Sequence, residues 1–322
     1  MTAAETDFSP AEVDRARRYH RPLYLAFAAE ATLGLAVAAG YAVAVPGERL
    51  ATWAASLPWW AVALVLTAAV VVTSFLVRLP IGFWRGYVRE RRYGFSTQTA
   101  AGWLVDRSKA LAVTLAFAGV PLLALVGLAR ALPTAWPAVA APGAAVLVLL
   151  LGLIAPVVLE PMFNRFRPLA DESLGRELRE LSVRAGVPVE RVLVADASRR
   201  TRKENAYVSG IGRTRRVVLY DTLLARAAPR ELRLITAHEL SHRRARHVAK
   251  GALLGGLGAA ASVLVLWALL RSGSVLDTIG ATGAGDPRIV PFALLATGVL
   301  ELAVLPVAAR LSRRWERVAD RG

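Results

Sequence analysis

Long apolar stretches dominate the pattern of hydrophobic and polar positions along this chain. Six of them have about the 20 mostly apolar residues that a helix needs to cross the hydrocarbon of a bilayer. The pattern therefore predicts about six membrane-spanning helices. We expect them at residues 22–45, 59–77, 110–128, 141–159, 248–270 and 289–309.

The longest polar segment, residues 160–249, predicts a small soluble domain of helices and strands. Asp171 is a suitable N-cap, and leucines then recur at helical spacing as far as Gly186. Pro229 opens a second helix, because proline favours the first helical position. Between the two helices, three short runs predict strands: 192–194, 205–209 and 216–220.

The expected fold class is mainly α: a polytopic membrane protein with about six transmembrane helices and an inserted small α+β domain. The chain then divides into three parts. Residues 1–159 form an N-terminal membrane domain of four spans with a polar loop at 78–109, residues 160–249 form the inserted domain, and residues 250–322 hold the last two spans.

The composition agrees with a membrane protein. The 322 residues are 55% hydrophobic and their mean hydropathy is +0.45, whereas soluble domains have about 45–50% apolar residues. Disordered and fibrous proteins are thereby excluded, and a purely soluble enzyme is not expected. The chain has no cysteine, which rules out disulfides, zinc knuckles and thiol catalysis. Any metal site must therefore use His, Asp or Glu.

The basic residues lie mainly on alternate loops. The chain carries 40 Lys and Arg against 24 Asp and Glu, a net charge of +16. Arginines crowd the segment before the first span, the loop at 78–109, the segment 160–249 and the tail, whereas the other loops have few. This alternation predicts that both termini and the inserted domain are cytoplasmic. Topology and anionic lipid then explain the charge, so we expect the lipid bilayer as a partner and no nucleic acid.

The chemistry of the chain centres on His238, Glu239 and His242 in the second predicted helix of the inserted domain. Four residues turn an α-helix by about 400°, so His238 and His242 lie about 40° apart on one face. That geometry lets two imidazoles bind one metal ion. Glu239 falls about 60° to the other side of His242, close enough to act on a water molecule at that metal. Since the chain has only four histidines, we interpret the pattern as a metal site rather than as two surface histidines.

A catalytic zinc site takes three protein ligands and keeps a fourth position open. Without cysteine, the best third candidate is Glu316, just beyond the last span. From spacing alone, Glu316 could equally be a surface residue paired with Arg313. Asp320 lies one helical turn further on, where it could accept the free ring N–H of a ligating histidine. His247 lies about 180° round the helix from His238, so we expect it to face away from the metal and to have a packing or supporting role.

Three segments and two metal motifs, spread over most of the chain in one order, carry a family resemblance. They are 85–99 with Trp103, Asp106 and Lys109; 161–166 with Pro168 and Leu169; 205–210 through Leu223 and Leu224; and the two metal motifs at 238–242 and 316–320. On these segments the chain resembles the type I CAAX prenyl proteases, integral-membrane zinc metalloproteases that process prenylated peptides, and their bacterial relatives.

The resemblance implies a gluzincin-like domain with one zinc ion per chain on His238, His242 and Glu316. It also implies that the strand holding Asn205, Ala206 and Tyr207 binds the substrate backbone by edge pairing. The family continues for many tens of residues beyond the second metal motif, with a His and an Arg that steady the oxyanion. This chain stops at residue 322, so we expect either a C-terminally truncated fragment or a protein without that stabilisation.

Two carboxylates lie deep in apolar sequence, Glu30 in the first predicted span and Glu301 in the last. A carboxylate that faces lipid is unfavourable, so each should face protein or water. The family encloses a water-filled chamber with its spans, and the resemblance implies that these two groups line it. The alternative is a protonated or locally paired Glu without a role in turnover.

We therefore expect a membrane-embedded zinc endopeptidase that hydrolyses peptide bonds of membrane-associated or lipidated peptides and proteins. The metal would polarise the scissile carbonyl, and Glu239 would move a proton from water to the leaving amine. Abundant Ala and a preference for Arg over Lys suggest a GC-rich bacterial source and a bacterial cytoplasmic membrane. Prenylated substrates are scarce there, so an HtpX-like membrane-protein quality-control protease is the main alternative. The non-enzymatic alternatives are a transporter or scaffold that uses Glu30 and Glu301, or a pseudoprotease.

Overall fold

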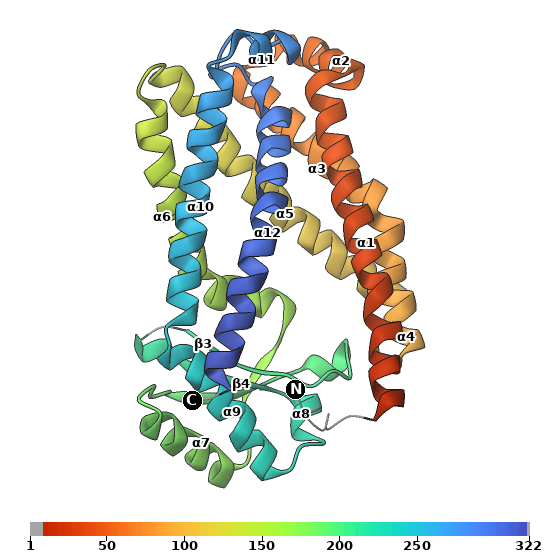
Figure 1. The fold of residues 1–322 in the computed structure, drawn as a ribbon, viewed down its shortest axis with the longest axis vertical. Coiled ribbons are helices and arrows are strands. Elements are labelled where there is room, and N and C mark those ends of the chain that lie inside the picture. The colour runs from red at the N-terminus through yellow and green to blue at the C-terminus, as the bar shows by residue number, and fades with distance from the viewer. Residues whose placement is uncertain (1–8, 211, 321–322) are drawn as a thin grey trace, which may run out of the picture.

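A computed structural model describes residues 9–210 and 212–320. Within this part of the chain, six helical stretches are long and apolar enough to cross a membrane, which confirms the predicted number. They are formed by α1 (Pro10–Val43), α3 (Trp59–Phe83) with its continuation to Arg92, α5 (Ala100–Ala131), α6 (Trp136–Phe163), α10 (His247–Leu270) and α12 (Ile289–Ala319). Figure 1 shows most of these helices running close to the long axis, with α5 crossing the bundle obliquely and the small sheet at one end.

The helices are longer than the apolar stretches that predicted them. The expected polar loop at 78–109 is helical apart from residues 93–99, because α3 continues through the π-helical turn η2 (Trp84–Val88) into α4 (Arg89–Arg92). The polar side chains that follow the apolar stretch therefore do not end this helix. It ends at Tyr93 and Gly94, where Gly94 has a φ of 75° that favours glycine.

Short helices close the end of the bundle that lies opposite the sheet (Figure 1). They are α2 (Val45–Trp53), the 3₁₀ turn η1 (Ala54–Ser56) and α11 (Gly273–Thr278). Beneath them, a buried apolar cluster joins four spans through Leu66, Val126, Leu266, Ile289 and Val290. At this end, therefore, α3, α5, α10 and α12 pack on one another as a unit.

The soluble domain is built on a four-stranded sheet in the order β1-β2-β4-β3. The strands are β1 (Phe166–Pro168), β2 (Arg191–Ala195), β3 (Ala206–Ser209) and β4 (Arg216–Tyr220). The presence of β2, β3 and β4 confirms the three predicted strands, whereas β1 was not predicted. The central pair, β2 and β4, is parallel, and both outer pairs are antiparallel. As a result β3 lies at an edge of the sheet.

Helices on the sheet complete this domain: α7 (Glu172–Arg184), α8 (Asp221–Leu224) and α9 (Pro229–Arg244), together with the 3₁₀ turns η3 (Ala197–Arg199) and η4 (Gly212–Thr214). The predicted helix starts are confirmed, because Asp171 Oδ1 accepts the Leu174 N–H at 3.0 Å and Pro229 is the first residue of α9. One buried cluster joins α7, α9 and the sheet through Leu178, Leu219 and Leu240. This core fixes α9 against the sheet.

Candidate metal centre

The helix α9 presents two imidazoles on the side away from its core contacts. Leu232, Thr236 and Leu240 recur every four residues and are buried, which holds one face of the helix on the domain core. His238 lies two residues after Thr236, about 200° round the helix, and His242 lies one turn beyond His238. Both imidazoles are therefore only partly buried and open toward α12.

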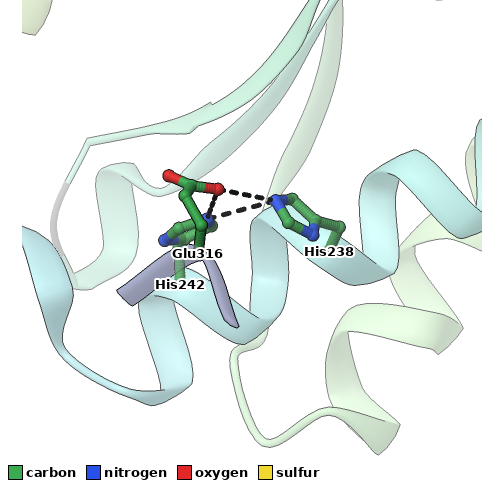
Figure 2. A group of neighbouring side chains, drawn as sticks. All are labelled: His238, His242 and Glu316. Carbon is green, nitrogen blue, oxygen red and sulfur yellow. Dashed lines mark hydrogen bonds and ion pairs between the residues drawn. The ribbon is translucent and has the colours of Figure 1, made fainter. Parts of the chain in front are cut away.

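The last turns of α12 bring Glu316 to these imidazoles (Figure 2). Its Oε2 lies 3.5 Å from His238 Nε2 and 3.4 Å from His242 Nε2, and the two Nε2 atoms are 3.2 Å apart. Among the described residues, these three form the one group of three possible ligands whose donor atoms all lie close together. Arg313, the alternative partner of Glu316, forms no ion pair with it in the described part of the chain.

The spacing of the three donor atoms fits a tetrahedral zinc ion. Zinc bonds to nitrogen and oxygen of about 2.0–2.1 Å place neighbouring tetrahedral ligands about 3.4 Å apart. The observed separations run from 3.2 to 3.5 Å. Two imidazoles and one carboxylate are also a donor set that catalytic zinc sites use, with the fourth position open.

Asp320 lies behind the ring of His238. Its Oδ1 lies 3.2 Å from His238 Nδ1, the ring nitrogen that points away from the other donors. A carboxylate in this position accepts the Nδ1 proton, which keeps Nε2 available for a metal and fixes the orientation of the ring. The structure thus places Asp320 where its sequence spacing suggested.

Replacing Asp320 with Asn should weaken metal binding about 10- to 100-fold, the usual effect of losing a carboxylate behind a ligating histidine. Asn keeps the size of the side chain but loses the charge. Competition with a chromophoric chelator measures the dissociation constant. Asp14→Asn, at an exposed position of α1, is the matched control, and an Asp320→Asn protein with the dissociation constant of the control would show that Asp320 does not support the site.

The expectation that His247 faces away from this centre is wrong. It assumed that one helix runs from His238 to His247, but α9 ends at Arg244 and α10 begins at His247. Arg246, between them, has a left-handed backbone with a φ of 56°. This turn folds His247 back, so its Nδ1 lies 3.0 Å from His242 Nδ1.

Glu239 lies beside the donor group without belonging to it. Its side chain is half-buried, and this burial raises the pKa of the carboxyl group above its ordinary value, while the nearby imidazoles of His242 and His238 act in the opposite direction. A carboxylate with a raised pKa is a better proton acceptor, which suits a general base.

The strand β3 turns part of its backbone toward the open edge of the sheet. In an antiparallel pair, every second residue exchanges hydrogen bonds with the partner strand. Tyr220 N–H donates to Asn205 O at 3.0 Å, so Asn205 and every second residue after it bond to β4. Ala206 and Val208 therefore face the edge. Arg243 of α9 occupies the carbonyl of Val208 with two N–H groups, which leaves the N–H and C=O of Ala206 for another strand.

The side chain of Tyr207 lies on the face of the sheet next to the membrane domain. Its hydroxyl donates to Glu160 at the end of α6, which also accepts hydrogen bonds from Ser209 at 2.7 Å and Arg216 at 3.1 Å. Burial, with Glu160 nearby, raises the pKa of the Tyr207 phenol, so this group remains a donor. Glu160 is not among the residues predicted from the sequence, although a carboxylate at the end of an apolar run is a signal that points to it.

Glu30 and Glu301 line one cavity of about 740 Å³ between α1, α3, α5 and α12. Glu30 is also locally paired, because its Oε2 lies 3.0 Å from Arg85 in the π-helical turn. Glu30 thus lines a cavity and is locally paired, and its part in turnover stays a prediction. Three arginines that the sequence did not predict as site residues, Arg78, Arg85 and Arg107, line the same cavity.

Comparison with known proteins matches almost the whole chain. The model of the CAAX prenyl protease N-terminal domain, described as having five membrane helices, matches residues 2–165. Within the described part of that range, the structure has four candidate spans. The model of peptidase family M48 matches residues 168–322, which include the donor group.

Individual relatives agree with these matches. CAAX prenyl protease 1 of Saccharomyces cerevisiae is 30% identical over 263 residues, covering 77% of this chain and 58% of that protein. An uncharacterized metalloprotease of Bacillus subtilis, YhfN, is 32% identical over 247 residues, covering 76% and 58%. The crystal structure of S. mikatae Ste24p superimposes with a TM-score of 0.73 at 27% identity, covering 82% of this chain and 65% of that one. The chain thus spans about 58% of the length of these two curated relatives.

Proposed function

Because the chain belongs to the CAAX prenyl protease family of M48 peptidases, we propose that it is a membrane-embedded, zinc-dependent endopeptidase. Its substrates are membrane-associated or lipidated peptides and proteins. The observation that carries the proposal is the meeting of His238, His242 and Glu316 within bonding distance of one ion, with Glu239 next to the first ligand in the same helix.

His238, His242 and Glu316 would hold one zinc ion per chain. When bound, zinc polarises the scissile carbonyl and acidifies water. Glu239 takes the proton from the attacking water and delivers it to the leaving amine. Asp320 keeps the proton of His238 on Nδ1, so that Nε2 stays unprotonated.

The substrate backbone binds along the edge of β3, next to the metal centre. Ala206 offers one N–H and one C=O there, and Arg243 ends the pairing by occupying the Val208 carbonyl. A substrate added as a strand is therefore held by a pair of hydrogen bonds at one of its residues. We place the sheet and the ends of α1 and α12 nearest it on the cytoplasmic side of a bacterial membrane, because the arginine-rich loops lie at that end.

A metal assay combined with a cleavage assay tests this function. The protein, purified in nanodiscs, should contain one zinc per chain and cleave a fluorogenic peptide. Chelation should abolish cleavage, and added zinc should restore it. Cleavage that survives complete removal of the metal, or a protein without stoichiometric zinc, would contradict the proposal.

A farnesylated peptide and its unmodified form separate the two substrate classes. A prenyl-peptide protease should prefer the farnesylated form in kcat/KM. Equal cleavage of both peptides would instead favour a role in membrane-protein quality control.

Edge pairing predicts a position-dependent effect of N-methyl groups in the substrate. Methylation removes one N–H donor, and only the residue that pairs with Ala206 should need it. Loss of one backbone hydrogen bond should reduce kcat/KM about 3- to 10-fold at that position. The two neighbouring positions point the other way and are the internal controls, since backbone groups alternate along a strand. A uniform effect at all positions would argue against pairing on β3.

A further inference from the structure

Both ligating histidines have a partner behind them, but the two partners differ in chemistry. His238 has the carboxylate of Asp320 at its Nδ1, whereas His242 has the imidazole of His247, with the two Nδ1 atoms 3.0 Å apart. His247 is 5% exposed, so water has little access to it. A second imidazole thus takes the place that a carboxylate or carbonyl usually has behind a metal ligand.

Once His242 Nε2 binds a metal, the contact between the two imidazoles allows only one arrangement of their protons. His242 Nε2 faces the other donor atoms and must be unprotonated to bind a metal. Its proton then resides on Nδ1 and is donated to His247 Nδ1. His247 in turn must leave Nδ1 bare and carry its own proton on Nε2. This hydrogen bond therefore stabilises the tautomer of His242 that a metal requires.

A neutral acceptor also preserves the charge of the centre. The carboxylates of Glu316, Asp320 and Glu239 already lie around the position of a bound zinc ion. A further carboxylate behind His242 would add negative charge and weaken the pull on a carbonyl oxygen. An imidazole at this position orients His242 without that effect.

The backbone is strained to hold His247 in place. Arg246 is the one non-glycine residue with positive φ among residues 9–210 and 212–320. Left-handed backbone is unfavourable for an L-residue, because Cβ comes too close to the following carbonyl oxygen. A strained backbone conformation persists only where the surrounding structure enforces it, and such conformations are common at functional sites. Here this conformation turns the chain between α9 and α10 so that the His247 ring meets the His242 ring.

The same ring also contacts the helix that supplies the third donor. His247 stacks on Trp315, the residue before Glu316, with ring centroids 5.0 Å apart and planes 7° apart. Gly251, one turn along α10, faces the same indole, and a Cβ there would make an ordinary contact with it at 3.6 Å. His247 thus touches the elements that carry two different ligands.

From this geometry we propose that His247 is a positioning residue of the metal centre, which holds His242 in the Nδ1–H tautomer and α12 in place through Trp315. The proposal rests on the metal ligation proposed above. It assigns to a neutral histidine the part that Asp320 has for the other imidazole.

Two substitutions separate the hydrogen bond from simple packing. His247→Asn keeps an acceptor, since Asn Oδ1 occupies the place of His Nδ1, but it loses the ring. His247→Phe keeps a ring to stack on Trp315 but has no acceptor. If tautomer selection matters, zinc affinity should fall about 10- to 100-fold in His247→Phe and remain closer to wild type in His247→Asn. A packing role alone predicts the opposite order.

The readouts are the zinc dissociation constant, from chelator competition, and the melting temperature of the metal-free protein, which controls for folding. If His247→Phe does not fold, His247→Leu replaces it, because Leu and Asn have nearly the same shape. Wild-type affinity in the variant without an acceptor, or the reversed order, overturns the inference while the proposed function stands. A wild-type protein without stoichiometric zinc overturns both.

Discussion

Replacing Glu239 with Gln should leave zinc bound while peptide cleavage falls about 10²–10⁴-fold, the range expected for loss of a general base. Zinc should remain because the donor group consists of His238, His242 and Glu316. Cleavage should fall because Gln has nearly the shape of Glu but cannot accept a proton. The position is half-buried, and burial already favours the uncharged form, so the substitution should not unfold α9.

The measurement pairs metal analysis with kcat/KM on the same preparation. Glu177→Gln is the matched control, because Glu177 is exposed and pairs with Arg233 on the domain surface. Cleavage at the control rate by Glu239→Gln would refute the role of Glu239 as the base. Loss of zinc would instead show that Glu239 is needed to build the site.

Replacing Glu316 with Ala should remove both zinc and activity. The carboxylate is the only negatively charged donor of the group, and without it the site has two neutral nitrogens. We expect a fall in zinc affinity larger than the 10- to 100-fold expected for a supporting residue. The contrast with Glu239→Gln is diagnostic, because one variant should keep its metal and the other should lose it.

Glu301→Gln provides the control on the same helix. Glu301 lies 15 residues before Glu316 on continuous α12, about 22 Å away along the axis. This variant should bind zinc like the wild type. A Glu316→Ala protein that still holds one zinc per chain would disprove the proposed ligand set.

The number of spans and the proximity of the two histidines of α9 could be predicted because each depends only on a short stretch of sequence. A run of about 20 apolar residues has one stable arrangement in lipid, and spacing by four on a helix brings His238 and His242 together whatever surrounds them. Strands β2, β3 and β4 were likewise visible as short apolar runs. The approach of Glu316 is non-local, and the family resemblance supplied more of that expectation than spacing did.

The features that sequence did not reveal depend on single backbone angles or on packing between distant segments. The position of His247 follows from the left-handed turn at Arg246, and Arg is not a residue that favours such a turn. The ion pair between Glu30 and Arg85 joins two spans, and only their packing brings it about. The strand β1 has three residues, too few for a periodic signal.

The three donor atoms of the candidate metal centre come from two parts of the protein, one in the sheet domain and one on a membrane-spanning helix. His238 and His242 lie on α9, which belongs to the sheet domain. Glu316 lies near the end of α12, whose first half packs among the membrane-spanning helices. A copy of residues 160–249 cut away from the last span would keep both imidazoles and lack their carboxylate. With the ligand set proposed above, such a fragment should not bind zinc as the whole chain does, so the proposed hydrolysis would depend on the last membrane-spanning helix as well as on the sheet domain.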